Sequence, residues 1–149
     1  TNSTGFPDDI GFHILNPKSK LANPKPSIAT KLNKIIVTDG IEAALKSYAK
    51  LKKNHAEKYN FSEHELNRLG YRYLGDNKMP EALAIFKINM QANPESWRAN
   101  DSYGEALLKN NEKEAAIKYY RKSLELNPEN ETGILALKKL GVNLENSGK

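Results

Sequence analysis

Two consecutive stretches of equal length decide the fold. They read EHELNRLGYRYLGDNKMPEALAIFKINMQANPES over residues 63–96 and WRANDSYGEALLKNNEKEAAIKYYRKSLELNPEN over residues 97–130. Laid over each other without gaps, they match at an offset of 34 residues in these pairs: Gly70 and Gly104, Leu74 and Leu108, Asn77 and Asn111, Ala82 and Ala116, and Asn93-Pro94-Glu95 and Asn127-Pro128-Glu129. A period of this size indicates a repeat protein in which each copy is one supersecondary unit.

The first copy predicts a helix, a turn and a second helix. Apolar and small residues recur at steps of three and four along its first half and so share one helix face: Leu66, Leu69, Gly70, Tyr73 and Leu74. Ser62, followed three residues later by Glu65, indicates a capping box at the start of that helix. Gly75-Asp76-Asn77 is typical turn sequence. Pro94 ends the second helix, because proline disfavours helical backbone at the residue before it.

Small and large residues alternate where the two helices of a copy should meet. Gly70 and Gly104 carry no side chain, which fits a place where the partner helix passes closely. Phe86 and Tyr120 stand one turn after a small alanine in the second helix of each copy, where an aromatic ring can fill the remaining gap. The pattern predicts an interlocked helix pair in each copy.

Residues 28–62 look like a degenerate third copy. Leu32 and Ile36 belong to an apolar face, Thr38-Asp39-Gly40 turns the chain, and Ala44 with Tyr48 repeats the pair of a small and an aromatic residue. This copy lacks the closing proline and has about four extra residues before the next copy begins, around positions 57–60.

Residues 131–149 predict a capping helix and a tail, since four apolar residues recur there: Ile134, Leu135, Leu137 and Leu140. A stack of repeats needs about three copies and a cap to be stable. Residues 28–149 meet that count as one domain. The 149-residue chain contains no cysteine, so neither disulfides nor thiolate metal sites contribute to it.

The spacing Leu69-Gly70, Tyr73, Ala82, Phe86 and Pro94, followed by its second copy, resembles the tetratricopeptide repeat. This resemblance implies an all-α fold of tandem antiparallel helix pairs, wound as a right-handed superhelix and closed by a C-terminal capping helix. The chain departs from the family pattern at four positions. Leu66 and Asn100 replace the usual tryptophan, and Asn89 and Ser123 replace a small alanine, which should weaken the packing slightly without changing the register.

The resemblance also implies a concave surface lined by the first helix of each copy. Its inward-facing positions form the candidate peptide-binding groove: Asn33, His64, Asn67, Tyr71, Arg98, Asp101 and Glu105. Such a mixture can hydrogen-bond an extended peptide, with Arg98 giving a charge-assisted contact. Asp101 and Glu105 stand where the family's chaperone-tail carboxylate clamp needs positive charge, so that mode is disfavoured. A solvated groove without a ligand is the alternative at each position.

Residues 1–27 differ in character from the repeats. They predict a short helix over residues 8–15 and a linker with Pro17, Pro24 and Pro26. The order TNSTGFPDDIGFHILNP, GIEAALKSYAKLK and FSEHELNRLGYRYL resembles the C-terminal region of bacterial beta-lactamase-related serine hydrolases. This implies that residues 1–27 hold the end of an upstream catalytic domain absent from this chain, and that the parent is periplasmic or otherwise exported. The expected partner is a protein or peptide, either the parent's catalytic domain or a second copy of this chain.

No motif in the sequence predicts catalysis. Ser47-Tyr48-Ala49-Lys50 matches the Ser-x-x-Lys pattern of penicillin-recognising enzymes, but the chain has no Lys-Thr-Gly element and the serine falls in mid-helix, so the match is a coincidence. The histidines at positions 13, 55 and 64 lack metal-ligand partners at helical spacing. We therefore expect no catalytic residues, no cofactor and no metal, and a role in protein–protein interaction or scaffolding.

Charge leaves two alternatives open. The net charge is +5, and the lysines are densest over residues 46–58, which suits a solvated helix face or a phosphate-binding stripe. A nucleic-acid-binding helical repeat is thus one alternative, although no RNA-binding motif accompanies the lysines. A structural spacer or dimerisation element is the other. The longest apolar runs are far too short to span a membrane.

Overall fold

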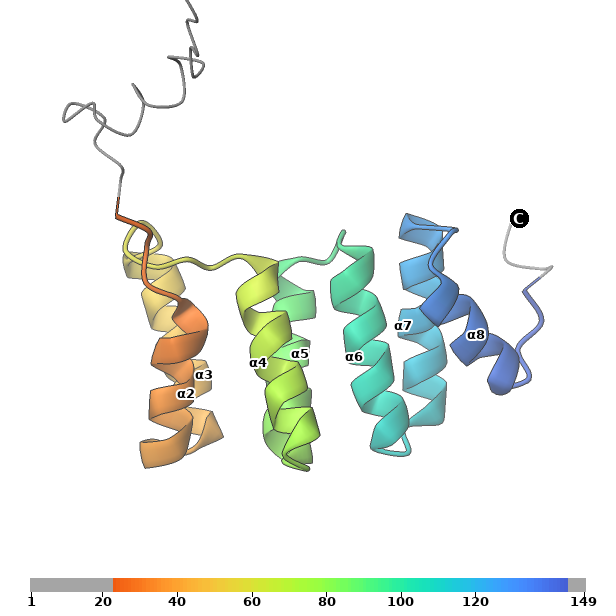
Figure 1. Cartoon of the computed structure of the whole chain (residues 1–149), viewed down its shortest axis with the longest axis horizontal. Coiled ribbons are helices and arrows are strands. Elements are labelled where there is room, and N and C mark those ends of the chain that lie inside the picture. Colours follow the sequence, from red (N-terminus) through yellow and green to blue (C-terminus); the bar gives the residue numbers. More distant parts are fainter. Residues whose placement is uncertain (1–22, 145–149) are drawn as a thin grey trace, which may run out of the picture.

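A computed structural model of the chain describes residues 23–144. Within that range the regular elements are seven helices, which Figure 1 shows as a single row: α2 (Ile28–Asp39), α3 (Ile41–Asn54), α4 (Glu63–Gly75), α5 (Met79–Ala92), α6 (Trp97–Lys109), α7 (Lys113–Leu126) and α8 (Glu131–Lys139). The prediction of an all-α fold is confirmed. The short helix predicted for residues 8–15 lies outside the described residues.

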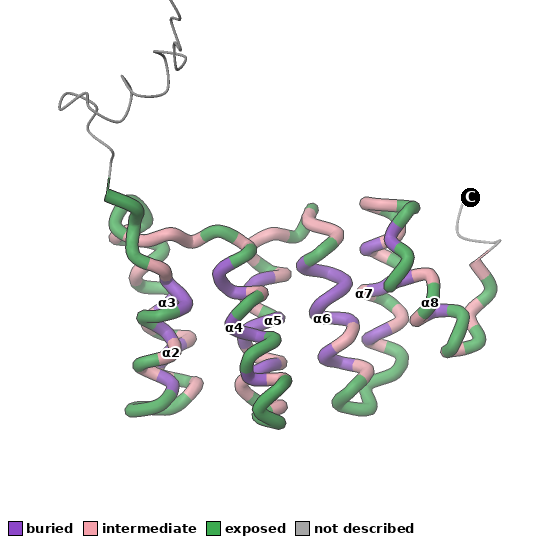
Figure 2. The backbone as a smooth tube through the Cα atoms, viewed as in Figure 1, coloured by how far each residue is buried: buried purple, intermediate pink, exposed green. Residues whose placement is uncertain are grey.

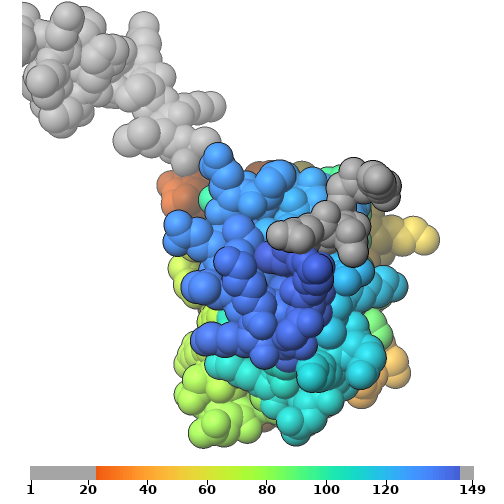
Figure 3. Space-filling view, turned by 90° about the vertical axis from the view of Figure 1, so that its right-hand side faces the viewer, coloured from red at the N-terminus to blue at the C-terminus, as the bar shows by residue number. Residues whose placement is uncertain are grey.

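Neighbouring helices pack in chain order as pairs, α2 with α3, α4 with α5, and α6 with α7, while α8 packs on α7. The first helices are also neighbours of one another, because α2 contacts α4 and α4 contacts α6. They form one layer, with α3 and α5 behind α2 and α4, while α7 lies beside α6 (Figure 1). Buried residues occur in every helix along the row (Figure 2). Viewed from the far end, α8 covers the end of the stack (Figure 3).

The interlock of small and aromatic residues is present in both clear copies. A Cβ atom at Gly70 would lie 2.7 to 2.8 Å from three ring atoms of Phe86, and one at Gly104 would lie 3.3 Å from Cγ of Tyr120. Both rings are buried. Each glycine thus lets the aromatic ring of the second helix touch the backbone of the first, as the sequence predicts.

The turns between paired helices also follow the sequence. Asn77 and Asn111 occupy equivalent positions and have positive φ angles of 57° and 62°. Asparagine tolerates this left-handed conformation better than most residues. Gly40, with φ of 86°, turns the chain between α2 and α3. The second helices end at Ala92 and Leu126, two residues before a proline in each copy.

The predicted capping box is wrong. Ser62 is the N-cap residue of α4, but its side chain makes no capping hydrogen bond. The Glu65 carboxylate instead accepts hydrogen bonds from the Ser27 hydroxyl and from Nδ2 of Asn60. Asn60 lies in the extra residues before α4 and pairs with the linker through its backbone. Its N–H donates to the Pro26 carbonyl at 2.9 Å, and its carbonyl accepts from the N–H of Ile28 at 3.2 Å. Glu65 therefore ties α4 to the linker and to the insertion.

The apolar residues predicted for the last helix do not all face the core. Leu137 of α8 is fully buried, whereas Leu135 is 57% exposed. The start of α8 is held by polar contacts. Its N-cap residue Asn130 is buried and donates hydrogen bonds from Nδ2 to Asp101 at 2.7 Å and to the Ser123 hydroxyl at 3.1 Å. Docking of α8 thus combines an apolar contact with a buried polar network.

Candidate functional site

The seven predicted groove residues all lie on first helices. Asn33 is on α2, three lie on α4 and three lie on α6. Because α4 is the neighbour of both α2 and α6, these helices present one continuous layer. Within that layer the structure gives the seven side chains different surroundings, so they do not contribute equally to an open surface.

Tyr71 connects α4 to α6. Its hydroxyl donates to Oε2 of Glu105 at 2.8 Å and lies 3.2 Å from the Ser102 hydroxyl. Its ring meets Phe86 edge-on, with 4.9 Å between ring centroids, yet the residue remains 39% exposed. Burial of the hydroxyl raises the pKa of Tyr71 well above its ordinary value, so the phenol stays protonated and keeps donating. Tyr71 is therefore a fixed, partly exposed aromatic side chain on the layer of first helices.

The two acidic residues of α6 are engaged within the protein. The Glu105 carboxylate also pairs with the Lys109 ammonium at 3.2 Å. Asp101 is buried and accepts a hydrogen bond from Asn130. Burial raises the pKa of Asp101, and the hydrogen bond from Asn130 offsets part of that rise. Asp101 is thus a structural link to α8 rather than an exposed groove residue.

Four predicted groove residues remain. Oδ1 of Asn33 accepts from the Tyr73 hydroxyl at 2.7 Å, which joins α2 to α4. Asn67 is half-buried, and its buried Oδ1 has no hydrogen-bond partner among the described residues. His64 and Arg98 are exposed near the starts of α4 and α6. The Arg98 guanidinium lies over the Trp97 ring, 4.5 Å from its centroid, which holds its charge at the surface.

A pocket of about 280 Å³ opens between α2 and α4. Its lining consists of two arginines, two small polar side chains and two apolar ones: Arg68, Arg72, Thr30, Asn33, Ala29 and Leu69. Of these residues the sequence predicts only Asn33 as part of a site, because Arg68 and Arg72 each stand one position after a predicted groove residue of α4. The sequence does contain a signal for the two arginines, because their spacing of four residues places both side chains on the same face of a helix.

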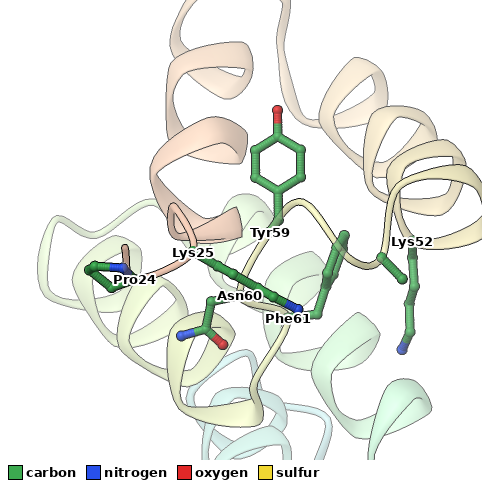
Figure 4. Close-up of a pocket in the computed structure, with 7 residues that line it drawn as sticks. Pro24, Lys25, Lys52, Tyr59, Asn60 and Phe61 are labelled. Atoms are coloured by element: carbon green, nitrogen blue, oxygen red, sulfur yellow. The ribbon is translucent and has the colours of Figure 1, made fainter. Parts of the chain in front are cut away.

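A second pocket, of about 460 Å³, lies where the linker and the insertion meet the end of α3 (Figure 4). Phe61 of this pocket packs edge-on against Tyr59, with 6.3 Å between ring centroids, and against the neighbouring Tyr48 of α3, with 5.6 Å. Lys25 reaches across toward Phe61, while Tyr59 points away (Figure 4). Lys52 also lines this pocket, but it is held over the Tyr48 ring and within 3.4 Å of the Tyr48 hydroxyl.

The coincidental Ser-x-x-Lys pattern lies within α3, where Ser47 is half-buried and Lys50 is exposed. Over residues 23–144, no three histidine, aspartate or glutamate side chains gather in a way that could hold a metal ion. None of the described helices is long and apolar enough to cross a membrane. Comparison of the chain with known protein families and with curated proteins gives no match.

Proposed function

We propose that this chain is a protein-interaction module of the tetratricopeptide type, and that it binds an extended peptide across α2, α4 and α6. The 34-residue repeat and the interlock of Gly70 with Phe86 support the repeat type. The observation that carries the binding proposal is the layer of first helices. This layer exposes the aromatic side chain of Tyr71 on α4 and the cationic Arg98 at the start of α6, and it also contains the arginine-lined pocket between α2 and α4.

This surface has the chemistry that binding needs. Tyrosine and arginine are enriched among the residues that dominate binding energy in interfaces, since they combine apolar area with polar ends. Tyr71 is held by Glu105 and by the edge-on Phe86 ring, so binding of a partner loses little conformational entropy at this side chain. The groove is therefore organised before a partner arrives.

We further propose that the module belongs to a serine hydrolase whose catalytic domain lies outside this chain. The order of motifs from residue 1 to residue 74 supports this parentage. The favoured partner is then a segment of that catalytic domain or of a second copy of the chain. Mixing the module with a separately produced upstream domain, and measuring binding by calorimetry, tests this part of the proposal.

Peptide selection from a displayed random library tests the binding function directly. Selected peptides should perturb backbone amide signals of α2, α4 and α6 in two-dimensional NMR spectra of the labelled chain. Arg98→Ala should weaken their binding, whereas Arg121→Ala should not, because Arg121 is an equally exposed arginine of α7 in the other layer. Peptides that bind only α3, α5 or α7, or that are sensitive to Arg121 alone, would exclude the groove.

A further inference from the structure

We infer that the pocket between α2 and α4 binds the side-chain carboxylate of an acidic peptide residue through Arg68 and Arg72. This inference rests on the proposed peptide-binding function and names the chemistry of the ligand. It differs from a clamp on a chain terminus, because the basic residues used here are both on α4 and the pocket opens between only two helices.

The charge of the pocket favours a monoanion. Arg68 donates from Nη2 to Oε2 of Glu65 at 3.1 Å, and Glu65 is held in turn by Ser27 and Asn60. Arg72 is exposed and forms no ion pair among residues 23–144. Two guanidinium groups and one carboxylate leave a formal charge of +1. A carboxylate neutralises that charge, whereas a phosphate monoester carries about −1.5 to −2 at neutral pH.

The unused polar groups of the pocket are mostly donors. Arg68 gives one of its N–H groups to Glu65, and no side-chain hydrogen bond of Arg72 is formed within residues 23–144. Oδ1 of Asn33 is occupied by the Tyr73 hydroxyl, which leaves the two N–H groups of Nδ2. An ionised carboxylate only accepts hydrogen bonds and matches the planar guanidinium with two parallel contacts. The donor set therefore selects for an acceptor.

Apart from Glu65, which pairs with Arg68, no acidic residue within residues 23–144 forms an ion pair with either arginine. Glu105 is occupied by Tyr71 and Lys109, and Asp101 is buried against Asn130. Ala29 and Leu69 supply apolar lining that can contact the methylene groups of a glutamate or aspartate side chain. The pocket volume of about 280 Å³ accommodates such a side chain.

The test uses NMR titration of the isotopically labelled chain with a blocked alanine-rich pentapeptide carrying a central glutamate. Signals of the Arg72 Nε–Hε group and of the Thr30 and Asn33 amides should shift with saturation. The same peptide with glutamine should bind about tenfold more weakly, because the charge-assisted contacts are lost. Arg72→Gln should weaken binding of the glutamate peptide by about the same factor, whereas Arg121→Gln on α7 should leave it unchanged.

Three outcomes would overturn the assignment. The first is equal binding of the glutamate and glutamine peptides. The others are binding of only the corresponding phosphoserine peptide, or of only a glutamine peptide whose C-terminal carboxylate is left unblocked. The proposed function fails separately. If selected peptides bind near Tyr71 without moving the pocket signals, the function holds and this inference falls. If the glutamate peptide saturates the pocket but no selected peptide binds the first-helix layer, the carboxylate site holds and the proposed peptide-binding function falls.

Discussion

The contact between Gly70 and Phe86 allows a substitution to be predicted from geometry. In Gly70→Ala, the new Cβ would stand 2.7 to 2.8 Å from three carbons of the Phe86 ring. Such distances are shorter than carbon atoms tolerate, so the ring or the helix must move. Phe86 is fully buried, which leaves its ring little room to yield. The substitution therefore forces α4 and α5 apart.

Two opposing effects set the magnitude. Overpacking of a core costs about 1–3 kcal/mol, and the rigidity of the buried ring places this case at about 2–3 kcal/mol within that range. Alanine is favoured over glycine inside a helix by about 1 kcal/mol. The net expectation is a loss of about 1–2 kcal/mol in the free energy of unfolding.

Gly104→Ala is the matched control, because Gly104 occupies the same position one repeat later. Its Cβ would lie 3.3 Å from Cγ of Tyr120 and 3.4 Å from the Ala116 carbonyl oxygen, so shifts of a few tenths of an ångström suffice. The gain in helix propensity then offsets the crowding, and the net change stays within about 0.5 kcal/mol.

Urea unfolding followed by circular dichroism compares the two variants through their midpoints, provided that the slopes agree. A midpoint for Gly70→Ala equal to that of Gly104→Ala, or equal to that of the parent chain, would refute the steric argument. Adding Phe86→Leu to Gly70→Ala should restore part of the lost stability relative to the sum of the single changes, since it removes the clashing ring.

Further predictions concern the polar contacts of α6. Burial holds the pKa of Asp101 above its ordinary value of 3.8, so the folded chain binds this proton more tightly than the unfolded chain. The free energy of unfolding should therefore fall as the pH rises from 3.8 through the raised pKa. Asp101→Asn should remove that decline, as urea midpoints measured across the acid range would show. Asn130→Ala should cost about 1–3 kcal/mol, because it deprives a buried carboxylate of its donor, and hydrogen exchange should show α8 opening first. Tyr71→Phe removes the hydroxyl contacts to Glu105 and Ser102 but keeps the ring, so thermal unfolding should show a loss of about 0.5–1.5 kcal/mol.

The sequence predicts those parts of the fold that depend on short-range pattern. Gly70 and Phe86 lie 16 residues apart in one copy, and their 34-residue repetition identifies both as members of an interlock. The turns at Asn77 and Asn111 are equally local, because asparagine tolerates positive φ wherever the chain needs it. Repetition strengthens each of these inferences, since a chance match does not recur in register.

Contacts between copies are harder to predict. The three-residue spacing of Ser62 and Glu65 predicts that Glu65 caps the helix. Its carboxylate instead accepts hydrogen bonds from Ser27 in the linker and Asn60 in the insertion. Similarly, Asp101 reads as a groove residue from its repeat position but is buried against Asn130 of the next unit. Where a side chain has two possible hydrogen-bond partners, the tertiary packing decides which one it contacts, and a local sequence motif does not contain that information.

One polar departure from the repeat, Ser123, lies where the last unit joins the stack. Ser123 replaces an alanine and receives a hydrogen bond from Asn130. Gly133 makes room for that contact, since a Cβ there would lie 2.9 Å from Nδ2 of Asn130 and 3.0 Å from the Ser123 hydroxyl. Because Asn130 also donates to Asp101, this junction engages one of the two carboxylates of α6.

The proposed peptide-binding surface is therefore uneven along its length. At the α6 end, Asp101 and Glu105 are satisfied within the protein, so a ligand would have to displace existing hydrogen bonds to use them. At the α2–α4 end, the donors of Arg72 and the Asn33 amide have no such partner within residues 23–144, and new contacts there displace only water. The bond between Asn130 and Asp101 is buried, and breaking a buried hydrogen bond without replacing it costs more than breaking a solvated one. Specificity for a partner should therefore reside in the first half of the stack. Tyr71, at the boundary, then contributes apolar contact area to either half.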